Sequence, residues 1–193
     1  GFKPLYFRPG AFSANDATAS TLVKLGFRGG SLSIPGRVWP ERYCIWAGTP
    51  PYPHRMHPDF RCSYGDMDFE NIPLSVDFSR PGSSNQYFCY EDLRPSGRKS
   101  DPRLILDNIV KKIKMDDPKI PVIQIITHND QPFDNPAHES RRRLEITLES
   151  IQSICREQGF NPKSSSIEEV VDMVMARPPD MAGTWEQDND VHF

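Results

Sequence analysis

Prolines limit the regular structure of this chain more than any other residue type. The sequence contains 19 prolines in 193 residues, about twice the usual share of ~5%. Five of them fall between Val38 and Tyr64, where each removes a backbone hydrogen-bond donor. We therefore expect an irregular loop there, of the kind that compact domains keep for a lid or for binding.

Composition excludes several classes of protein. The net charge of −3 gives no basic footprint for a nucleic acid, so no nucleic-acid partner is expected. No apolar run approaches the ~18 residues that a membrane span requires. The 4 cysteines show no zinc-like spacing, and their pairing cannot be derived from the sequence.

Strand and helix patterns alternate on both sides of the loop, which predicts an α/β fold. Short strands are predicted at 5–7, 32–34 and 72–78, and a helix capped by Ser13 should end at Gly26. Residues 80–99 are polar and typical of turns. Three helices follow, one begun by Asp101 and Pro102, one over 138–158, and one capped by Ser166.

The strongest strand pattern covers residues 122–128. It is apolar on both faces, which predicts a central parallel strand that ends at His128. Ligands of α/β folds bind beyond the carboxyl ends of parallel strands, so His128 and the following Asn129 would face that rim. An imidazole suits general acid or base work near neutral pH. A histidine that is simply hydrogen-bonded at a strand end explains the pattern equally well.

Arg8 occupies the equivalent place after the first predicted strand. A guanidinium there can orient a carboxylate or bind substrate, whereas the plain alternative is a surface salt bridge. The run from Arg141 to Arg143 is interpreted as the solvated face of its helix, whose apolar stripe should contain Leu144, Leu148, Ile151 and Cys155.

The proline-rich stretch offers two further sets of candidates. His54, His57 and Asp66 could hold a metal ion, but an H-x-x-H spacing in a loop is a weak signal, and a solvated loop is the simpler interpretation. Trp39, Trp46 and Tyr52 could stack on sugar rings, or could form a small core beneath the loop.

Several short motifs together resemble the polysaccharide deacetylase (NodB homology) family. The segment from Phe7 to Asn15, the phrase Leu25-Gly26-Phe27, and Ser31 to Pro35 look like the middle of such a domain. Ile125 to His128 is similar to the family's late leucine-x-histidine motif. The resemblance covers about Phe7 to Val174 and is weakest in the central loop.

The resemblance implies a distorted (β/α) barrel that binds a divalent metal, often zinc, and removes acetyl groups from a carbohydrate. His128 would be the general acid that protonates the leaving group, and Arg8 would orient the catalytic carboxylate. Asn129 and the aromatic residues Trp39, Trp46 and Tyr52 would contact the glycan. The enzyme would then be a hydrolase of carbon–nitrogen amide bonds, and the alternative is a non-catalytic carbohydrate-binding relative that uses the aromatic loop.

Two departures from the family pattern bear on the boundaries of the domain. The family's paired aspartates and its H-x-x-x-H metal motif precede the arginine motif, whereas only seven residues precede Arg8 here. A position that is commonly aspartate in the family is Gly30. We therefore expect residues 1–175 to be the C-terminal portion of a barrel, with the base and the metal ligands in a preceding segment. Residues 176–193 should form a polar tail with Trp185 as an anchor, and the compartment, bacterial cytoplasm or cell envelope, stays open.

Overall fold

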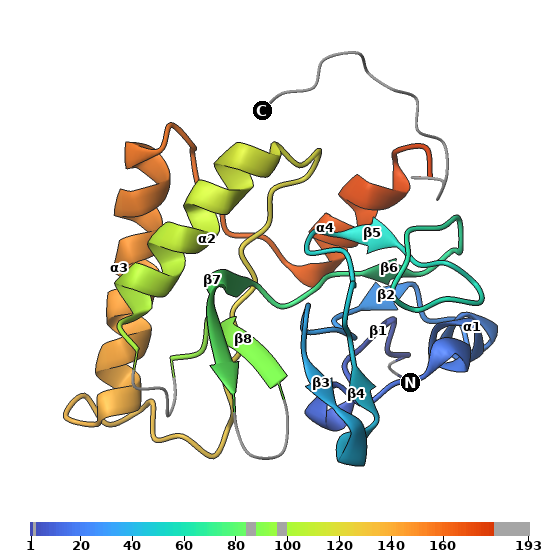
Figure 1. Cartoon of the computed structure of the whole chain (residues 1–193), viewed down its shortest axis with the longest axis horizontal. Coiled ribbons are helices and arrows are strands. Elements are labelled where there is room, and N and C mark those ends of the chain that lie inside the picture. Colours follow the sequence, from blue (N-terminus) through green and yellow to red (C-terminus); the bar gives the residue numbers. More distant parts are fainter. Residues whose placement is uncertain (2, 84–87, 96–99, 180–193) are drawn as a thin grey trace.

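The computed structural model describes residues 1, 3–83, 88–95 and 100–179 of the chain. These residues form two four-stranded sheets and four α-helices. Figure 1 shows the two sheets next to each other. The expected anchor at Trp185 and most of the predicted polar tail lie outside the described residues. The architecture is mixed α/β as predicted, and the described strands do not close into a barrel.

The first sheet has three parallel strands and one antiparallel edge strand. Its order is β1 (Tyr6–Phe7), β2 (Gly29–Gly30), β6 (Glu70–Asn71) and β5 (His54–Arg55). The first three strands run in the same direction and β5 runs against β6. The carboxyl ends of β1, β2 and β6 therefore meet at one edge.

Backbone hydrogen bonds continue beyond the two-residue strands and extend this sheet into an arc. The amide of Ser31 donates to Phe7 and that of Ile72 donates to Gly30, so β1, β2 and β6 stay in contact past their ends. The amide of Ser75 then donates to the carbonyl oxygen of Gln124 at 3.2 Å. Residues 122–126 thus form the fourth member of the arc, in chain order.

The close approach of β1 and β2 explains the glycine at position 30. A Cβ atom there would collide with the carbonyl oxygen of Phe7, and would also crowd that residue's backbone nitrogen. The sheet can therefore keep this spacing only with glycine at position 30.

The second sheet is antiparallel and corrects two predictions. Its order is β4 (Cys44–Ile45), β3 (Val38–Trp39), β8 (Phe88–Asp92) and β7 (Val76–Ser83). The stretch from Val38 to Tyr64 is therefore not wholly irregular, because β3, β4 and β5 lie within it. Residues 80–99 are not all turns either, since β7 and β8 form a hairpin there.

Three predicted strands are also wrong. Residues 122–128 adopt no regular strand, although Gln124 and Ile126 make single backbone hydrogen bonds to Ser75 and Leu93. Residues 72–78 are not one half-buried strand, because residues 69–77 are all buried and link β6 of the first sheet to β7 of the second. Likewise 32–34 is not a strand, although Leu32 and Ile34 are fully buried.

The described residues form four α-helices: α1 (Asp16–Lys24), α2 (Pro102–Asp116), α3 (Glu139–Glu157) and α4 (Ile167–Met175). Helix α2 packs against β7, α3 packs against α2, and α4 contacts β5 and β6. The predicted caps of α2 and α4 are confirmed, since Asp101 accepts from the amide of Arg103 and Ser166 forms a capping box with Glu169. The cap of α1 is Asn15 with Thr18, and not Ser13.

The buried face of α3 differs from the predicted one. Arg143, expected in solvent, is 9% exposed and donates to the carbonyl oxygens of Pro95 and Ser100. Leu148, expected in the core, is 49% exposed. The two guanidinium hydrogen bonds and the burial of Thr147 and Ser150 show that a polar face of the helix packs inward.

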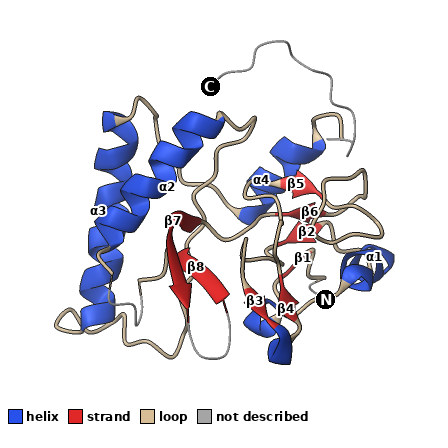
Figure 2. Ribbon diagram, viewed as in Figure 1, coloured by secondary structure: helices blue, strands red, loops and turns tan. Residues whose placement is uncertain are grey.

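The apolar core divides between the two sides of the molecule. Figure 2 shows α2 and α3 beside the hairpin of β7 and β8, with the first sheet, α1 and α4 on the other side. One cluster, which includes Phe12, Trp46 and Ile126, fills the side of the first sheet. A second, which includes Leu93, Leu106 and Cys155, lies between α2 and α3.

Candidate functional site

Arg8 follows β1 directly and lies at the edge where the parallel strands end. Its side chain is exposed, yet partial desolvation lowers the pKa of the guanidinium from its ordinary value. Within residues 1, 3–83, 88–95 and 100–179, no side chain forms a hydrogen bond or an ion pair with it. The guanidinium is therefore available for an incoming carboxylate.

His128 lies at the other end of the arc, two residues after the buried Ile126. The amide of Ile126 donates to the carbonyl oxygen of Leu93 at 3.4 Å, which places His128 next to Arg94. The imidazole is exposed, and its Nε2 atom lies 3.5 Å from Arg94 Nη1. That distance marks a weak contact rather than a strong hydrogen bond.

A buried carboxylate holds Arg94 in place. Asp92 is fully buried, and its Oδ2 atom accepts from Arg94 Nη2 at 3.0 Å and from Arg37 Nη2 at 2.9 Å. Arg37 itself is 5% exposed. Arg94 thus connects a rigid interior ion pair to a surface histidine. We call Arg37, Asp92, Arg94 and His128 the rim network.

The rim network constrains the proton on His128. Guanidinium nitrogens only donate hydrogen bonds, so a contact with Arg94 Nη1 needs Nε2 as the acceptor and the imidazole proton on Nδ1. With a proton on Nε2, two donors would face each other. The contact with Arg94 is therefore compatible with a neutral imidazole that carries its proton on Nδ1, and not with one that carries it on Nε2.

A polar seam joins the members of the arc below this edge. Asn71 is fully buried, and its side chain accepts from the amide of Leu32 and donates to Ser33 Oγ at 2.8 Å. Ser31 Oγ contacts the side chain of Gln124 at 3.3 Å. These bonds fix the positions of the strand ends from which Arg8 and His128 extend.

Trp46 does not lie where a sugar ring could stack on it. It is fully buried and its indole nitrogen donates to the carbonyl oxygen of Phe12 at 2.8 Å. The prediction that Trp46 binds substrate is therefore wrong, and the residue belongs to the core. Trp39 is half-buried, with the guanidinium of Arg42 5.4 Å from the centre of its ring.

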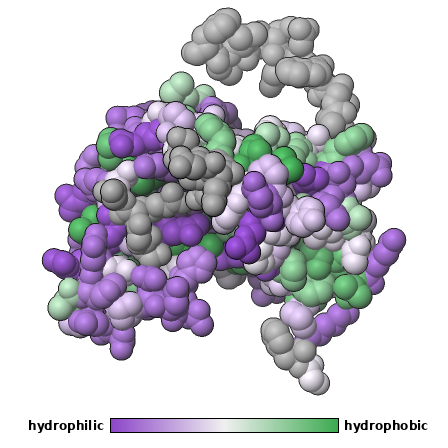
Figure 3. Space-filling model, turned by 60° about the horizontal axis from the view of Figure 1, so that its bottom comes forward, coloured by the Kyte–Doolittle hydropathy of each residue, from purple (hydrophilic) through white to green (hydrophobic). Residues whose placement is uncertain are grey.

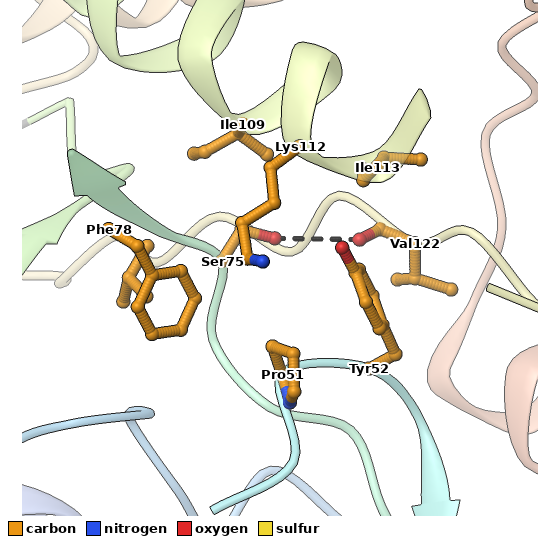
Figure 4. A pocket seen from close by; sticks show the side chains of 9 residues that line it. Pro51, Tyr52, Ser75, Phe78, Ile109, Lys112, Ile113 and Val122 are labelled. Carbon is orange, nitrogen blue, oxygen red and sulfur yellow. Dashed lines mark hydrogen bonds between the residues drawn. The ribbon is translucent and has the colours of Figure 1, made fainter. Parts of the chain in front are cut away.

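Tyr52 lies apart from the two tryptophans, on the side of α2. Its hydroxyl donates to Asp116 Oδ2 at 2.6 Å, and burial together with this carboxylate raises the pKa of the phenol. Figure 4 shows it lining a small hollow, with Phe78 and Lys112 on the other walls. The other predicted site residues do not line this hollow.

The three weak metal candidates are not brought together. His54 is fully buried with Nδ1 at 2.8 Å from the carbonyl oxygen of Tyr52, and His57 Nδ1 accepts from the amide of Asp59. In the part of the chain that the structure describes, no three histidine, cysteine, aspartate or glutamate side chains are grouped to hold a metal ion, so Asp66 completes no set. The three weak candidates therefore form no metal site, and the metal that the family resemblance implies stays a prediction for ligands in a preceding segment.

The remaining predicted residues are simpler to place. Asn129 is exposed and lies in the turn after His128, where the amide of Gln131 donates to the carbonyl oxygen of His128. All four cysteines are free, and burial raises the pKa of the Cys44 thiol to about 11.

Sequence reasoning missed Arg37, Asp92 and Arg94. The only available signal was the pair Asp92 and Arg94 flanking the apolar Leu93 in an otherwise polar stretch. Such pairs of charged residues are common at protein surfaces, and nothing in the sequence predicts that this pair contacts Arg37 or His128.

The surface adds two observations. On the face drawn in Figure 3, hydrophilic side chains predominate and the apolar ones form small groups. None of the helices in the described ranges is both long and apolar enough to span a membrane.

Comparison with protein-family models, with curated proteins and with solved structures finds no match to this chain.

Proposed function

We propose that this chain is part of a carbohydrate deacetylase and carries its proton-donating histidine and its carboxylate-orienting arginine. One observation carries the proposal. Arg8 follows the first member of the hydrogen-bonded arc, and His128 lies two residues beyond the buried end of the last. The arc has its members in chain order, as a (β/α) barrel requires.

The reaction is the hydrolysis of an N-acetyl group on a glycan. The oxygen of water joins the acetyl carbon, the carbon–nitrogen bond breaks, and the amine nitrogen takes up a proton. His128, exposed at the rim, supplies that proton to the leaving nitrogen. The products are acetate and the free amine.

Arg8 orients the carboxylate that acts as the base. Its guanidinium has no hydrogen-bond or ion-pair partner among the described residues. This supports the role, because a bidentate contact with a carboxylate uses two guanidinium N–H groups at once. The base itself, and the ligands of any metal, are expected outside this sequence. The described residues group no three side chains that could hold a metal ion.

The test is acetate release from an N-acetylated chito-oligosaccharide by the full-length protein supplied with zinc. His128→Ala should lower kcat by roughly 10²- to 10⁴-fold and leave KM little changed, since the imidazole acts on the leaving group. His138→Asn is the matched control, because His138 caps α3 and asparagine caps equally well.

Two results would contradict the proposal. One is a wild-type protein that releases no acetate with zinc, manganese or cobalt. The other is equal kcat in the His128→Ala and His138→Asn variants. Glycan binding without acetate release would instead favour the non-catalytic carbohydrate-binding relative, which the burial of Trp46 leaves with Trp39 and Tyr52 as its aromatic contacts.

A further inference from the structure

Helix α3 has a histidine as its N-cap. His138 Nδ1 accepts a hydrogen bond from the amide of Ser140 at 3.2 Å. That amide is one of the first four of the helix, which have no acceptor within the helix itself. Ser140 is only 4% exposed, so water does not readily replace the imidazole as the acceptor. The first turn of α3 therefore depends on this imidazole.

Only a neutral imidazole can make this contact. A ring nitrogen accepts a hydrogen bond when it carries no proton, whereas both nitrogens of a protonated imidazole are donors. A protonated His138 would present an N–H group to the amide of Ser140 and leave that amide without an acceptor. It would also place a positive charge at a helix N-terminus, where the helix dipole disfavours cations. Both effects favour release of the cap.

The charges around His138 do not hold its ring in the protonated form. Among the residues that the structure describes, the imidazole forms no ion pair and no hydrogen bond other than the one with Ser140. The charged side chains within four positions of it are two acids and two bases: Asp134, Glu139, Arg141 and Arg142. The two acids are exposed, where solvent screens them.

The other segments that contact the start of α3 present neutral oxygen atoms to it, those of Gln131, Phe133, Pro95 and Ser100. The hydrogen bond with Ser140, rather than a charged partner, therefore determines which form of His138 the folded helix prefers.

The first turn of α3 in turn holds the segment that follows His128. Ser140 Oγ donates to Gln131 Oε1 at 2.8 Å, and the amide of Gln131 donates to the carbonyl oxygen of His128 at 3.3 Å. Arg141 Nη1 donates to the carbonyl oxygen of Phe133 at 3.3 Å. Because these bonds start from the first turn of the helix, a loosened turn also loosens residues 128–133.

We propose that His138 is a pH-sensitive cap, whose protonation at low pH releases the first turn of α3 and, with it, residues 128–133. At neutral and alkaline pH the uncharged ring keeps the turn closed. The cap goes beyond the proposed function and does not depend on it, because it concerns the stability of a helix start and not the chemistry at His128.

The test is hydrogen exchange of the intact protein at pH 5 and at pH 8, the range over which histidine ordinarily changes its charge. The comparison is with His138→Asn, since asparagine caps a helix and does not titrate. At pH 8 the two proteins should protect the first turn of α3 equally. At pH 5 protection in the wild type should fall roughly 5- to 30-fold below that in the variant, the size expected for a lost cap.

His57→Asn is the matched control. His57 Nδ1 also accepts from an amide two residues on, that of Asp59, but it does so in a loop away from α3. This variant should keep the wild-type response of α3 to pH.

Three outcomes would overturn the cap. The first is a wild-type protein whose first turn of α3 is as well protected at pH 5 as at pH 8, after correction for intrinsic exchange rates, which needs no variant to fold. The second is the same loss of protection at pH 5 in His138→Asn. The third is an unchanged amide of Gln131 when the first turn opens, which would remove the link to residues 128–133.

Discussion

Two carboxylates on the same hairpin are equally buried and are held in opposite ways. Asp77 on β7 is 1% exposed and Asp92 on β8 is fully buried. Among the described residues, Asp77 accepts only from neutral donors, the amide and hydroxyl of Ser79 and the side-chain amide of Asn108. Asp92 accepts from the guanidiniums of Arg37 and Arg94.

The difference separates two uses of a buried charge. The neutral partners of Asp77 join the hairpin to α2, since Asn108 lies on that helix. The charged partners of Asp92 carry the ion pair outward to His128 at the rim. Asp77, which accepts from amides and a hydroxyl, has a structural role. Asp92, which lies between two guanidiniums, also fixes the position of the Arg94 cation at the surface.

The largest expected effect is on Asp92. Asp92→Asn removes the buried negative charge that accepts from Arg37 and Arg94, so we expect the free energy of unfolding to fall by about 3–5 kcal/mol. Urea denaturation measures it. A loss no greater than that of Asp77→Asn would break the comparison between the two carboxylates.

Cys44 extends the comparison to a buried acid whose pKa is set mainly by desolvation. Burial raises the pKa of its thiol from 9.0 to about 11, so between these values the folded state keeps a proton that the unfolded chain has lost. The free energy of unfolding should therefore fall as pH rises through that window, by about 2–3 kcal/mol.

The difference between wild type and Cys44→Ala isolates this effect, because other thiols and phenols titrate in both proteins. The two free energies of unfolding, measured at about pH 8 and about pH 11, should converge or cross in favour of the variant. A constant difference at both pH values would show that burial does not hold the proton on Cys44.

Asp77→Asn should cost less than Asp92→Asn. Asparagine retains one oxygen acceptor for Ser79 and loses charge-assisted bonds, so we expect a loss of about 1–2 kcal/mol in the free energy of unfolding. The same urea experiment measures it. A loss above that of Asp92→Asn would reverse the assignment of roles.

The smallest effect is expected at Asn108. Asn108→Ala removes one donor to Asp77 and leaves both bonds from Ser79, so the free energy of unfolding should fall by about 1 kcal/mol. Asn161→Ala, at an exposed position outside the helices, serves as a control for the loss of an amide. A larger loss at Asn108 would show that the link to α2 dominates the environment of Asp77.

Local chemistry explains which elements the sequence predicted. The cap of α2 at Asp101 and the capping box of α4 at Ser166 involve residues within three positions of each other, so the pattern contains the whole interaction. The apolar face of α2 is equally readable, because its apolar residues repeat at helical spacing and all are buried: Ile105, Leu106, Ile109, Val110 and Ile113.

Long-range contacts explain what the sequence could not supply. Residues 122–128 look like a strand, but their hydrogen-bond partners Ser75 and Leu93 come from two different segments, so no regular ladder forms. Arg143 can be buried because the carbonyl oxygens of Pro95 and Ser100 accept hydrogen bonds from its guanidinium. Arg8 and His128 were identified from their places after extended segments, whereas the rim network joins residues up to 91 positions apart, from Arg37 to His128.

Gly30 has a consequence for the evolution of this sheet. Any side chain at position 30 would collide with the carbonyl oxygen of Phe7. A single substitution could not place an acid there without first separating β1 from β2. A descendant that needs an acid at this edge must therefore recruit it from another strand.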